Sequence, residues 1–300
     1  MYSLQKKSTM SASLKLLFLI NQEKPEIICT THDHCSMLIG VLRLFSPHKF
    51  KHVIWQRNIL SFHLQYENIL RQILLRTLYK TYKTADLLLV NSKSAKEDIK
   101  KNIKLINIPI KILYNYIGIK KQKRPIKNKN YLLSIGRLVK SKNFDFLIRS
   151  FSKIKNIFKG NLYIVGEGEE KNNLQEVIKA QKCKSRVFIK PVSTNVLSFI
   201  NGCKAFIFSS LSESCPNVIL EALILNKPIV ALDDHAGVRE LLKYAKTGIL
   251  VSQKSEAIFA DAIIQGINLK KINPTKRFYK RYVLQSISEK FYHTLQKSLF

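Results

Sequence analysis

The feature that most constrains the fold of this chain is a regular alternation of short apolar runs with longer stretches of helical periodicity. Such alternation is typical of parallel sheets whose connecting helices cover their faces. We therefore predict an α/β fold. The predicted strands cover residues 26–30, 52–55, 87–90, 110–113, 131–135, 161–165, 186–189, 205–208, 228–231 and 249–251.

A basic segment at 117–130 divides the chain into two parts. It is rich in Lys and Arg, lacks acidic residues and contains one proline, so self-repulsion favours an extended linker. We predict an N-terminal domain over 1–116, this linker, a complete doubly wound domain over 131–275 and a final helix over 276–300. Helices of the second domain are expected at 143–158, 171–181, 217–225, 238–243 and 256–269.

The net charge is +31, from 51 Lys and Arg against 20 Asp and Glu. Such a surface attracts the phosphates of nucleic acids, anionic lipids or nucleotides. The charge is spread over both halves and no nucleic-acid-binding motif is present, so nucleic acid is not the expected partner. A basic nucleic-acid-binding protein without enzymatic activity stays open as an alternative.

Cysteine usage and the lack of long apolar runs bear on the compartment. The five cysteines form no Cys-x-x-Cys pair and are odd in number, which favours a reducing environment. No apolar run approaches the roughly 18 residues of a membrane span, and the N-terminal apolar run is too short for a signal peptide. We therefore expect a cytoplasmic protein, with peripheral contact to the cytoplasmic face of a membrane.

Residues 62–83 have the pattern of one basic amphipathic helix. Two interpretations stay open. The apolar positions either pack into the core of the N-terminal domain, or they face an anionic membrane surface together with the basic residues. The apolar positions are Leu64, Ile69, Leu70, Ile73, Leu74 and Leu78, and the interleaved basic residues are Arg71, Arg76, Lys80 and Lys83.

The most informative segment is 209–222, directly after the predicted strand 205–208. Pro216 suits the first turn of a helix, and Ser214 is a candidate cap. The amides of Asn217 and Val218 would then point out of the helix N-terminus, where anions bind. The sequence therefore predicts an anion site beyond the carboxyl end of this strand.

Two carboxylates accompany this predicted helix. Glu221 lies about one turn beyond its start, roughly 5–7 Å along the axis, where a carboxylate can accept from both ribose hydroxyls of a bound nucleotide. Glu213 precedes the helix and is expected to face the same opening. No other Asp or Glu occurs between Glu176 and Glu213. The alternative is a capped helix with two solvated glutamates.

A second segment follows the strand predicted at 131–135. Gly136 permits a tight turn, and Arg137 and Lys142 would lie at the same edge of the sheet, where two cations suit a diphosphate. Solvated surface charge is the alternative for both residues.

Two further motifs are assigned ordinary roles. The glycine-rich run 165–170 lacks the third glycine of a dinucleotide-binding loop and carries three glutamates, so we interpret it as a strand-to-helix turn. The run 32–35, His-Asp-His-Cys, has no matching second cluster, so we expect a loop there and no metal.

Taken together, these residues resemble the retaining glycosyltransferases of family 4, which have the GT-B fold. The resemblance is carried by "SIGRLVKSKNFDFLIRSF", "LYIVGEGEEKNNLQEVI", "SSLSESCPNVILEALILNKPIVALD" and "AGVRELL", in this order. Residues 14–115 resemble only the later part of the family's N-terminal domain, through "EKPEIICTTHDH", "HVIWQRN" and "ADLLLVNSKSAKED". The fold implied is GT-B type, with two Rossmann-like parallel-sheet domains, the first incomplete, and a C-terminal helix that packs back toward the first.

The resemblance also implies roles for the site residues. Arg137 and Lys142, in the loop begun by Gly136, would neutralise the donor diphosphate. Glu213 would contact the transferred sugar and Glu221 the ribose. Pro216, Asn217 and Val218 would cradle phosphate, and the base would lie near Lys190 and Pro191, where the family usually has Gly instead of this proline.

The implied reaction is transfer of a sugar, with retention of configuration, from a nucleotide-sugar donor to a glycan or lipid-linked acceptor. The expected donor is UDP-hexose or UDP-N-acetylhexosamine, and no metal or other cofactor is expected. A truncated, catalytically impaired GT-B fragment that only binds nucleotide is the other alternative.

Overall fold

The computed structural model describes residues 9–65, 68–103, 107–117, 130–192, 196–233, 237–245, 248–269, 274–282 and 287–299. The chain forms two compact units, and each is described by itself. The first unit comprises Met1–Tyr114 and Ser286–Phe300, and the second comprises Asn115–Gln285. No helix in these ranges is both long and apolar enough to cross a membrane.

The first unit is built on a parallel sheet with the strand order β1-β2-β3-β4. Because the strands follow one another in chain order, right-handed connections place the linking helices on one face of the sheet. The strands are β1 (Ile27–Thr30), β2 (Lys51–Gln56), β3 (Leu87–Val90) and β4 (Ile110–Ile112). The helices before and between them are α1 (Thr9–Glu23), α2 (Asp33–Phe45), α3 (Leu60–Gln65), α4 (Ile69–Tyr79), the 3-10 helix η1 (Lys80–Thr84) and α5 (Lys93–Asn102).

The opposite face of this sheet is covered from the far end of the chain. Side chains of α13 (Ile287–Leu299) pack against Val53, Leu87, Leu89 and Leu113, which lie on that face. Phe291 of α13 stacks near Trp55, with ring centroids 6.0 Å apart. The first unit therefore includes a segment, α13, that begins 175 residues after the end of β4.

The second unit has a six-stranded parallel sheet with the order β10-β9-β8-β5-β6-β7. The chain runs outward from β5 through β6 to β7, then returns to the other side of β5 and runs outward again from β8 to β10. The order thus reverses between β5 and β8, which is where open α/β sheets bind ligands. The strands are β5 (Tyr131–Ile135), β6 (Asn161–Val165), β7 (Val187–Lys190), β8 (Ala205–Phe208), β9 (Ile229–Leu232) and β10 (Ile249–Val251).

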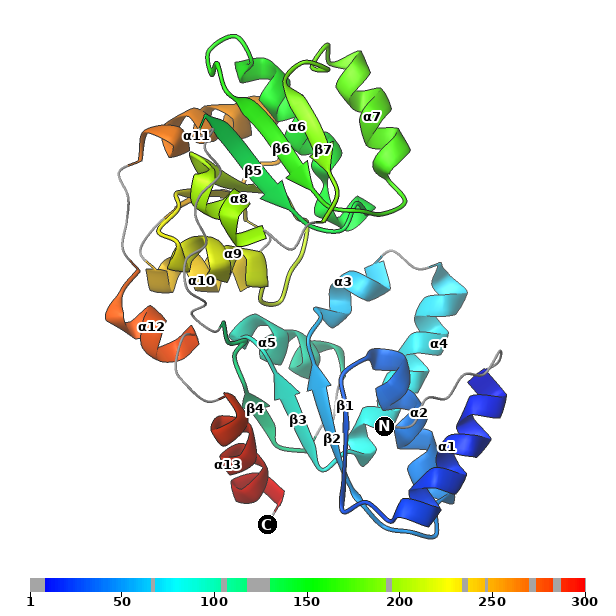
Figure 1. Ribbon diagram of the computed structural model, residues 1–300. Helices are drawn as coiled ribbons and strands as arrows, with labels where there is room; N and C mark the ends of the chain where they lie inside the picture. Colours follow the sequence, from blue (N-terminus) through cyan, green and yellow to red (C-terminus); the bar gives the residue numbers. More distant parts are fainter. Residues whose placement is uncertain are drawn as a thin grey trace. The chain divides into compact units, whose positions relative to one another are not determined.

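Helices cover both faces of the second sheet (Figure 1). On one face, α11 packs against α6 and α6 against α7, while α9 lies on the other between α8 and α10. The bounds are α6 (Phe144–Ile154), α7 (Lys171–Ala180), α8 (Val196–Gly202), α9 (Asn217–Ile224), α10 (Gly237–Ala245), α11 (Glu256–Asn268) and α12 (Lys276–Tyr282). A short 3-10 helix, η2 (Lys140–Lys142), precedes α6. The predicted fold class, two parallel-sheet α/β units, is confirmed.

Two predicted features in the first unit are wrong. The single helix over 62–83 is instead α3, α4 and η1: Asn68 caps α4 by accepting from the Arg71 N–H at 2.9 Å. Asp98, from α5, accepts from the Leu60 N–H at 2.6 Å at the start of α3. The expected loop at 32–35 is the start of α2, which begins at Asp33.

Ser92 caps α5, and its Oγ accepts from the Ala95 N–H at 3.1 Å. The one helix expected over 276–300 is two, α12 in the second unit and α13 in the first. The linker 117–130 lies outside the described residues except for its two ends.

Candidate functional site

Two loops meet where the order of the second sheet reverses. One follows β5 and covers 136–143, and the other follows β8 and covers 209–216. The Leu211 N–H donates to the Ser141 carbonyl at 2.9 Å, and the Ser209 hydroxyl donates to the Lys142 carbonyl at 2.8 Å. One bond joins two backbone groups and the other joins a side chain to the backbone, and both run from one loop to the other. They therefore fix the two loops relative to each other.

Lys142 and Glu213 form an ion pair across these loops. Their side chains are 18% and 25% exposed, so both charges are largely withdrawn from water. Gly136 lies beside the lysine stem, where an added Cβ would come within 3.4 Å of its Cδ and Cε. The structure therefore brings together the predicted residues Gly136, Lys142 and Glu213.

The glycine-rich turn after β6 supports the first loop. A Cβ on Gly166 would overlap the Gly136 carbonyl oxygen, so only glycine permits this approach of the two backbones. The Leu138 N–H donates to the Glu167 carbonyl at 2.8 Å, and the Leu138 carbonyl accepts from the Glu170 N–H at 2.9 Å. The interpretation of 165–170 as a strand-to-helix turn is confirmed, and its role is to hold the loop that carries the exposed Arg137.

The N-terminus of α9 opens at the same loop. Pro216 itself is the N-cap and its side chain makes no capping hydrogen bond, so the expected cap at Ser214 is wrong. The helix begins at Asn217, so the N-cap position falls on Pro216, two residues after the buried Ser214. The first intrahelical bond runs from the Ile219 N–H to the Pro216 carbonyl at 3.1 Å, so the Asn217 and Val218 amides precede it. These are the amides that an anion would meet.

Asn115 is a residue that the sequence reasoning missed. Its side chain is buried and its Nδ2 donates to the Cys215 carbonyl at 3.0 Å and to Asn217 Oδ1 at 2.7 Å. The second bond uses the oxygen of the Asn217 amide group, which leaves its NH2 group to other partners. Asn115 follows a strand that belongs to the first unit, and no local sequence signal connects it with α9.

Glu221 and Asn217 are four residues apart on α9 and therefore share one side of the helix. Their neighbours Ile219, Leu220 and Ala222 are buried, whereas Asn217 is exposed and Glu221 half-buried. Burial raises the pKa of the Glu221 carboxyl above its ordinary value. A partly desolvated carboxylate gains most from ligand hydroxyl donors.

Pro191 lies elsewhere on the same sheet. It follows β7, the edge strand two positions from β5, and is exposed together with Lys190. The Lys190 ammonium lies 5.8 Å from the centroid of the Phe188 ring.

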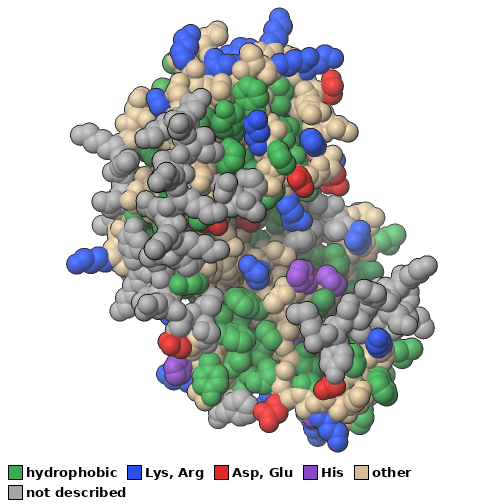
Figure 2. All heavy atoms as spheres, viewed as in Figure 1, with side chains coloured by type: hydrophobic (Ala, Val, Ile, Leu, Met, Phe, Trp, Pro, Cys, Tyr) green, Lys and Arg blue, Asp and Glu red, His purple; other side chains and the backbone are tan. Residues whose placement is uncertain are grey.

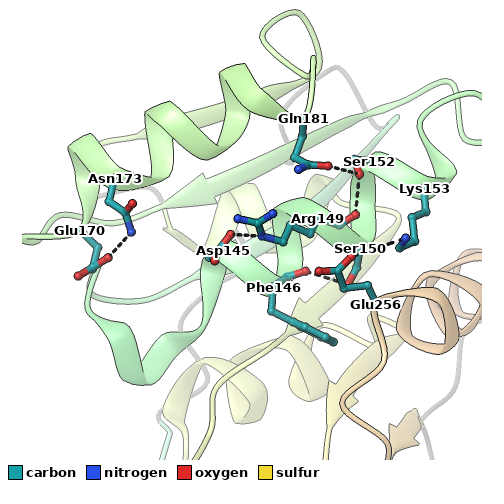
Figure 3. A network of polar contacts seen from close by, with 10 residues as sticks. All are labelled: Asp145, Phe146, Arg149, Ser150, Ser152, Lys153, Glu170, Asn173, Gln181 and Glu256. Carbon is teal, nitrogen blue, oxygen red and sulfur yellow. Dashed lines mark hydrogen bonds and ion pairs between the residues drawn. The ribbon is translucent and has the colours of Figure 1, made fainter.

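Polar contacts of α6 hold the helix that follows the first loop. Ser152 donates to Gln181 at the end of α7 at 2.9 Å, and Lys153 pairs with Glu256 of α11 at 3.6 Å (Figure 3). Within α6, Asp145 accepts from Arg149 at 2.7 Å. Two of these contacts join α6 to its neighbouring helices α7 and α11.

The first unit has its own polar cluster at the carboxyl ends of its strands. Asp33 accepts from the Tyr79 hydroxyl at 2.9 Å, and the Tyr82 hydroxyl donates to Gln56 at 3.0 Å. Burial raises the pKa of Tyr79 far above its ordinary range. Among the described residues no group of three or more His, Cys, Asp or Glu is arranged to hold a metal.

Comparison with known proteins identifies the family. The family model described as glycosyl transferases group 1 matches residues 117–282, more than half of the chain. The chain belongs to this family. A second model, described as Glycosyltransferase Family 4, matches residues 3–121 of this group 1 glycosyltransferase.

Relatives of this group 1 glycosyltransferase include two longer proteins. An uncharacterized glycosyltransferase of Methanocaldococcus jannaschii is 33% identical over 76% of this chain and 60% of its own length. The N-acetylgalactosamine-N,N'-diacetylbacillosaminyl-diphospho-undecaprenol 4-alpha-N-acetylgalactosaminyltransferase of Campylobacter jejuni is 34% identical over 62% of this chain and 51% of its own length. The chain thus spans between half and two thirds of the length of these relatives.

A solved structure confirms the fold of this group 1 glycosyltransferase. The Anabaena protein HepE, crystallised with UDP-glucose, aligns with a TM-score of 0.82 over 99% of this chain and 85% of its own, at 17% identity. At this identity the likeness concerns the GT-B architecture.

Proposed function

We propose that this protein transfers a sugar from a nucleotide-sugar donor to a glycan or lipid-linked acceptor. The observation that carries the proposal is the pairing of Lys142 with Glu213 at the sheet reversal, beside the open N-terminus of α9. A cation, a carboxylate and outward-pointing amides within two joined loops match the diphosphate and sugar of such a donor.

In this proposal the residues divide the donor between them. Lys142 and Arg137 neutralise the diphosphate, together with the Asn217 and Val218 amides and the turn at Pro216. Glu213 accepts from hydroxyls of the transferred sugar, and Glu221 accepts from the ribose hydroxyls. The base lies toward Pro191. Gly136 keeps room for the Lys142 stem.

The proposed reaction retains the configuration of the sugar. The bond between the anomeric carbon and the diphosphate oxygen breaks, the acceptor oxygen bonds to the same face of that carbon, and the acceptor proton passes to the departing diphosphate. Negative charge grows on the leaving group in the transition state, so fixed cations and a helix N-terminus favour the transition state over the ground state. No metal is required in this scheme.

Within the family, UDP-hexose or UDP-N-acetylhexosamine is the proposed donor. The name of the Campylobacter relative includes an undecaprenol-linked acceptor, which supports a lipid-linked or cell-surface glycan as the acceptor of this protein. An acceptor of that kind would bring this protein to the cytoplasmic face of a membrane.

Calorimetry with UDP and with GDP tests the donor site. We expect UDP to bind and Glu221→Ala to weaken binding by about 1.5–3 kcal/mol, the range for hydrogen bonds to a charged group. The matched control is Glu176→Ala, an exposed glutamate on α7 of the same unit. Equal dissociation constants for the wild type and Glu221→Ala would remove Glu221 from the site. Absence of nucleotide binding by the wild type would contradict the proposed function.

A further inference from the structure

The outward face of α4 is strongly apolar. Four of its side chains are exposed, Ile69 at 76%, Leu70 at 80%, Ile73 at 59% and Leu74 at 57%. Large apolar side chains this exposed are ordinary when they are scattered singly, but a contiguous group marks an interaction surface. We call these four residues the α4 apolar face.

The α4 apolar face is distinct from the side of the helix that stabilises the unit. At 3.6 residues per turn its four members span an arc of about 140°. Leu75, Leu78 and Tyr79 lie on the opposite side of the helix and pack against the core of the first unit. Packing in the core therefore accounts for these three residues, whereas the α4 apolar face is exposed in the part of the chain that the structure describes.

Basic side chains border the α4 apolar face. On the helix, Arg71 lies beyond one edge of the arc and Arg76 beyond the other, and both are exposed. Lys80 and Lys83 follow in η1 and are exposed as well. No acidic residue occurs from 68 through 85. Figure 2 shows hydrophobic and basic side chains next to one another at the edge of the first unit where α4 lies.

We propose that α4 docks this protein on an anionic membrane surface, with its apolar face in the boundary between headgroups and acyl chains. An apolar stripe with arginines on both sides matches a helix lying in the plane of a bilayer. The four basic residues would lie at the level of the anionic headgroups, where each contributes to attraction that salt screens. A protein partner would have to supply acidic groups on both sides of an apolar stripe, whereas a membrane presents them on every side.

This inference rests on the proposed function only for the role of docking, which is to bring a lipid-linked acceptor within reach. Docking itself needs neither donor nor acceptor. A vesicle assay without nucleotide therefore tests it separately, and calorimetry with UDP tests the donor site whatever the vesicles show.

The experiment is sedimentation of the full chain with vesicles of phosphatidylcholine and phosphatidylglycerol in equal amounts, and with phosphatidylcholine alone. We expect pelleting with the anionic vesicles only, and release at high salt. The double variant Leu70→Gln/Ile73→Gln should lower the partition coefficient at least roughly tenfold, because two exposed apolar side chains no longer enter the lipid. The matched control is Ile157→Gln/Val192→Gln, which removes two comparably exposed apolar side chains from the second unit.

The basic border has its own control. Arg71→Gln/Arg76→Gln should weaken pelleting at low salt more than Lys100→Gln/Lys101→Gln, which removes the same charge from exposed positions on α5. If both pairs reduce binding equally, net charge alone would explain it and the α4 site would be wrong.

A second measurement does not depend on loss of binding. Leu70→Trp in a Trp55→Phe background places the only tryptophan on the α4 apolar face. Its emission should shift to shorter wavelength with anionic vesicles and be quenched by brominated acyl chains. Unchanged emission with pelleted protein would overturn the proposal. So would a lipid-free dimer abolished by Leu70→Gln/Ile73→Gln, because the face would then bind a second copy.

Discussion

At the scale of the residue, the first unit carries a buried histidine without a charge partner on its ring. His52 is fully buried, and its Nε2 lies 3.1 Å from the Thr30 hydroxyl, which in turn contacts Ser36 at 2.8 Å. Its Nδ1 is buried and has no hydrogen-bond partner among the residues that the structure describes. Burial, aided by the nearby Arg43 cation, lowers the pKa of His52 from 6.5 to about 4.

This pKa predicts an acid-sensitive first unit. Between pH 6.5 and 4 the unfolded chain binds a proton at His52 that the folded state does not, so the free energy of unfolding falls as the pH is lowered through this window. The loss from this residue approaches about 3 kcal/mol at pH 4 and stops growing below it. Urea unfolding at several pH values measures it.

The informative comparison uses two histidine variants. His52→Gln should flatten the pH dependence between 6.5 and 4, whereas His293→Gln, at an exposed position on α13, should keep the slope of the parent. A parent-like slope in His52→Gln would show that other groups carry the acid sensitivity.

At the scale of the element, the start of α9 is held from outside the helix. Pro216 offers no side-chain cap, and the buried Asn115 side chain instead bonds the Cys215 carbonyl and the Asn217 side chain. A Cβ on Gly237, the first residue of α10, would overlap the Ser214 carbonyl oxygen. The helix N-terminus proposed to receive phosphate is thus fixed by a preceding segment and by a neighbouring helix.

We predict that Asn115 positions Asn217 for the donor. Asn115→Ala should weaken UDP binding by about 1 kcal/mol, the scale of one neutral hydrogen bond. Asn115→Asp should weaken it further, because a carboxylate would face two oxygens to which Asn115 now donates. Asn115→Ala should also raise the KM for the donor more than it lowers kcat.

The control for this prediction is Asn173→Ala, which removes an exposed hydrogen bond to Glu170 in the same unit. A variant that is merely destabilised would melt at a lower temperature but keep the stabilisation that UDP gives. Melting curves of each variant with and without UDP therefore accompany the titrations. Identical UDP affinities in Asn115→Ala and the wild type would contradict the positioning role.

At the scale of the whole molecule, the charge of +31 is distributed over both units rather than gathered in one site. On the face shown in Figure 2, Lys and Arg side chains lie over the first and the second unit alike. A field of this kind raises the local concentration of anionic ligands and depends strongly on ionic strength. Arg137 and Lys142 of the proposed donor site are two of these cations.

The corresponding prediction concerns metal removal. In the proposed site, Lys142, Arg137 and the start of α9 neutralise the leaving diphosphate, so EDTA should leave the hydrolysis or transfer of a UDP-sugar unchanged within error. Release of UDP is the measurement, with the chelated enzyme compared before and after added magnesium. Activity that disappears with EDTA and returns with the ion would contradict the metal-free mechanism.

Local sequence was sufficient to predict every strand of the described residues to within one residue at each end. Buried parallel strands are short runs of β-branched and apolar residues, and that pattern depends on nearest neighbours alone. Local sequence also placed Arg137, Lys142, Glu213 and the start of α9 at carboxyl ends of strands. The helices α1, α2 and α8 were missed, because most of the stability of a helix in a protein comes from the surface on which it packs rather than from its own local sequence.

Tertiary structure alone decided which strand ends meet. Nothing in the linear sequence indicates that β5 and β8 are neighbours in the sheet. The pairing of Lys142 with Glu213, 71 residues apart, could therefore not be derived from spacing. The bond of Asn115 to Asn217, 102 residues away, and the division of α4 into a packed and an exposed apolar side were equally hidden. Periodicity in the sequence shows how apolar side chains are spaced along a helix. Only the neighbouring elements of the folded structure determine which of these side chains are buried.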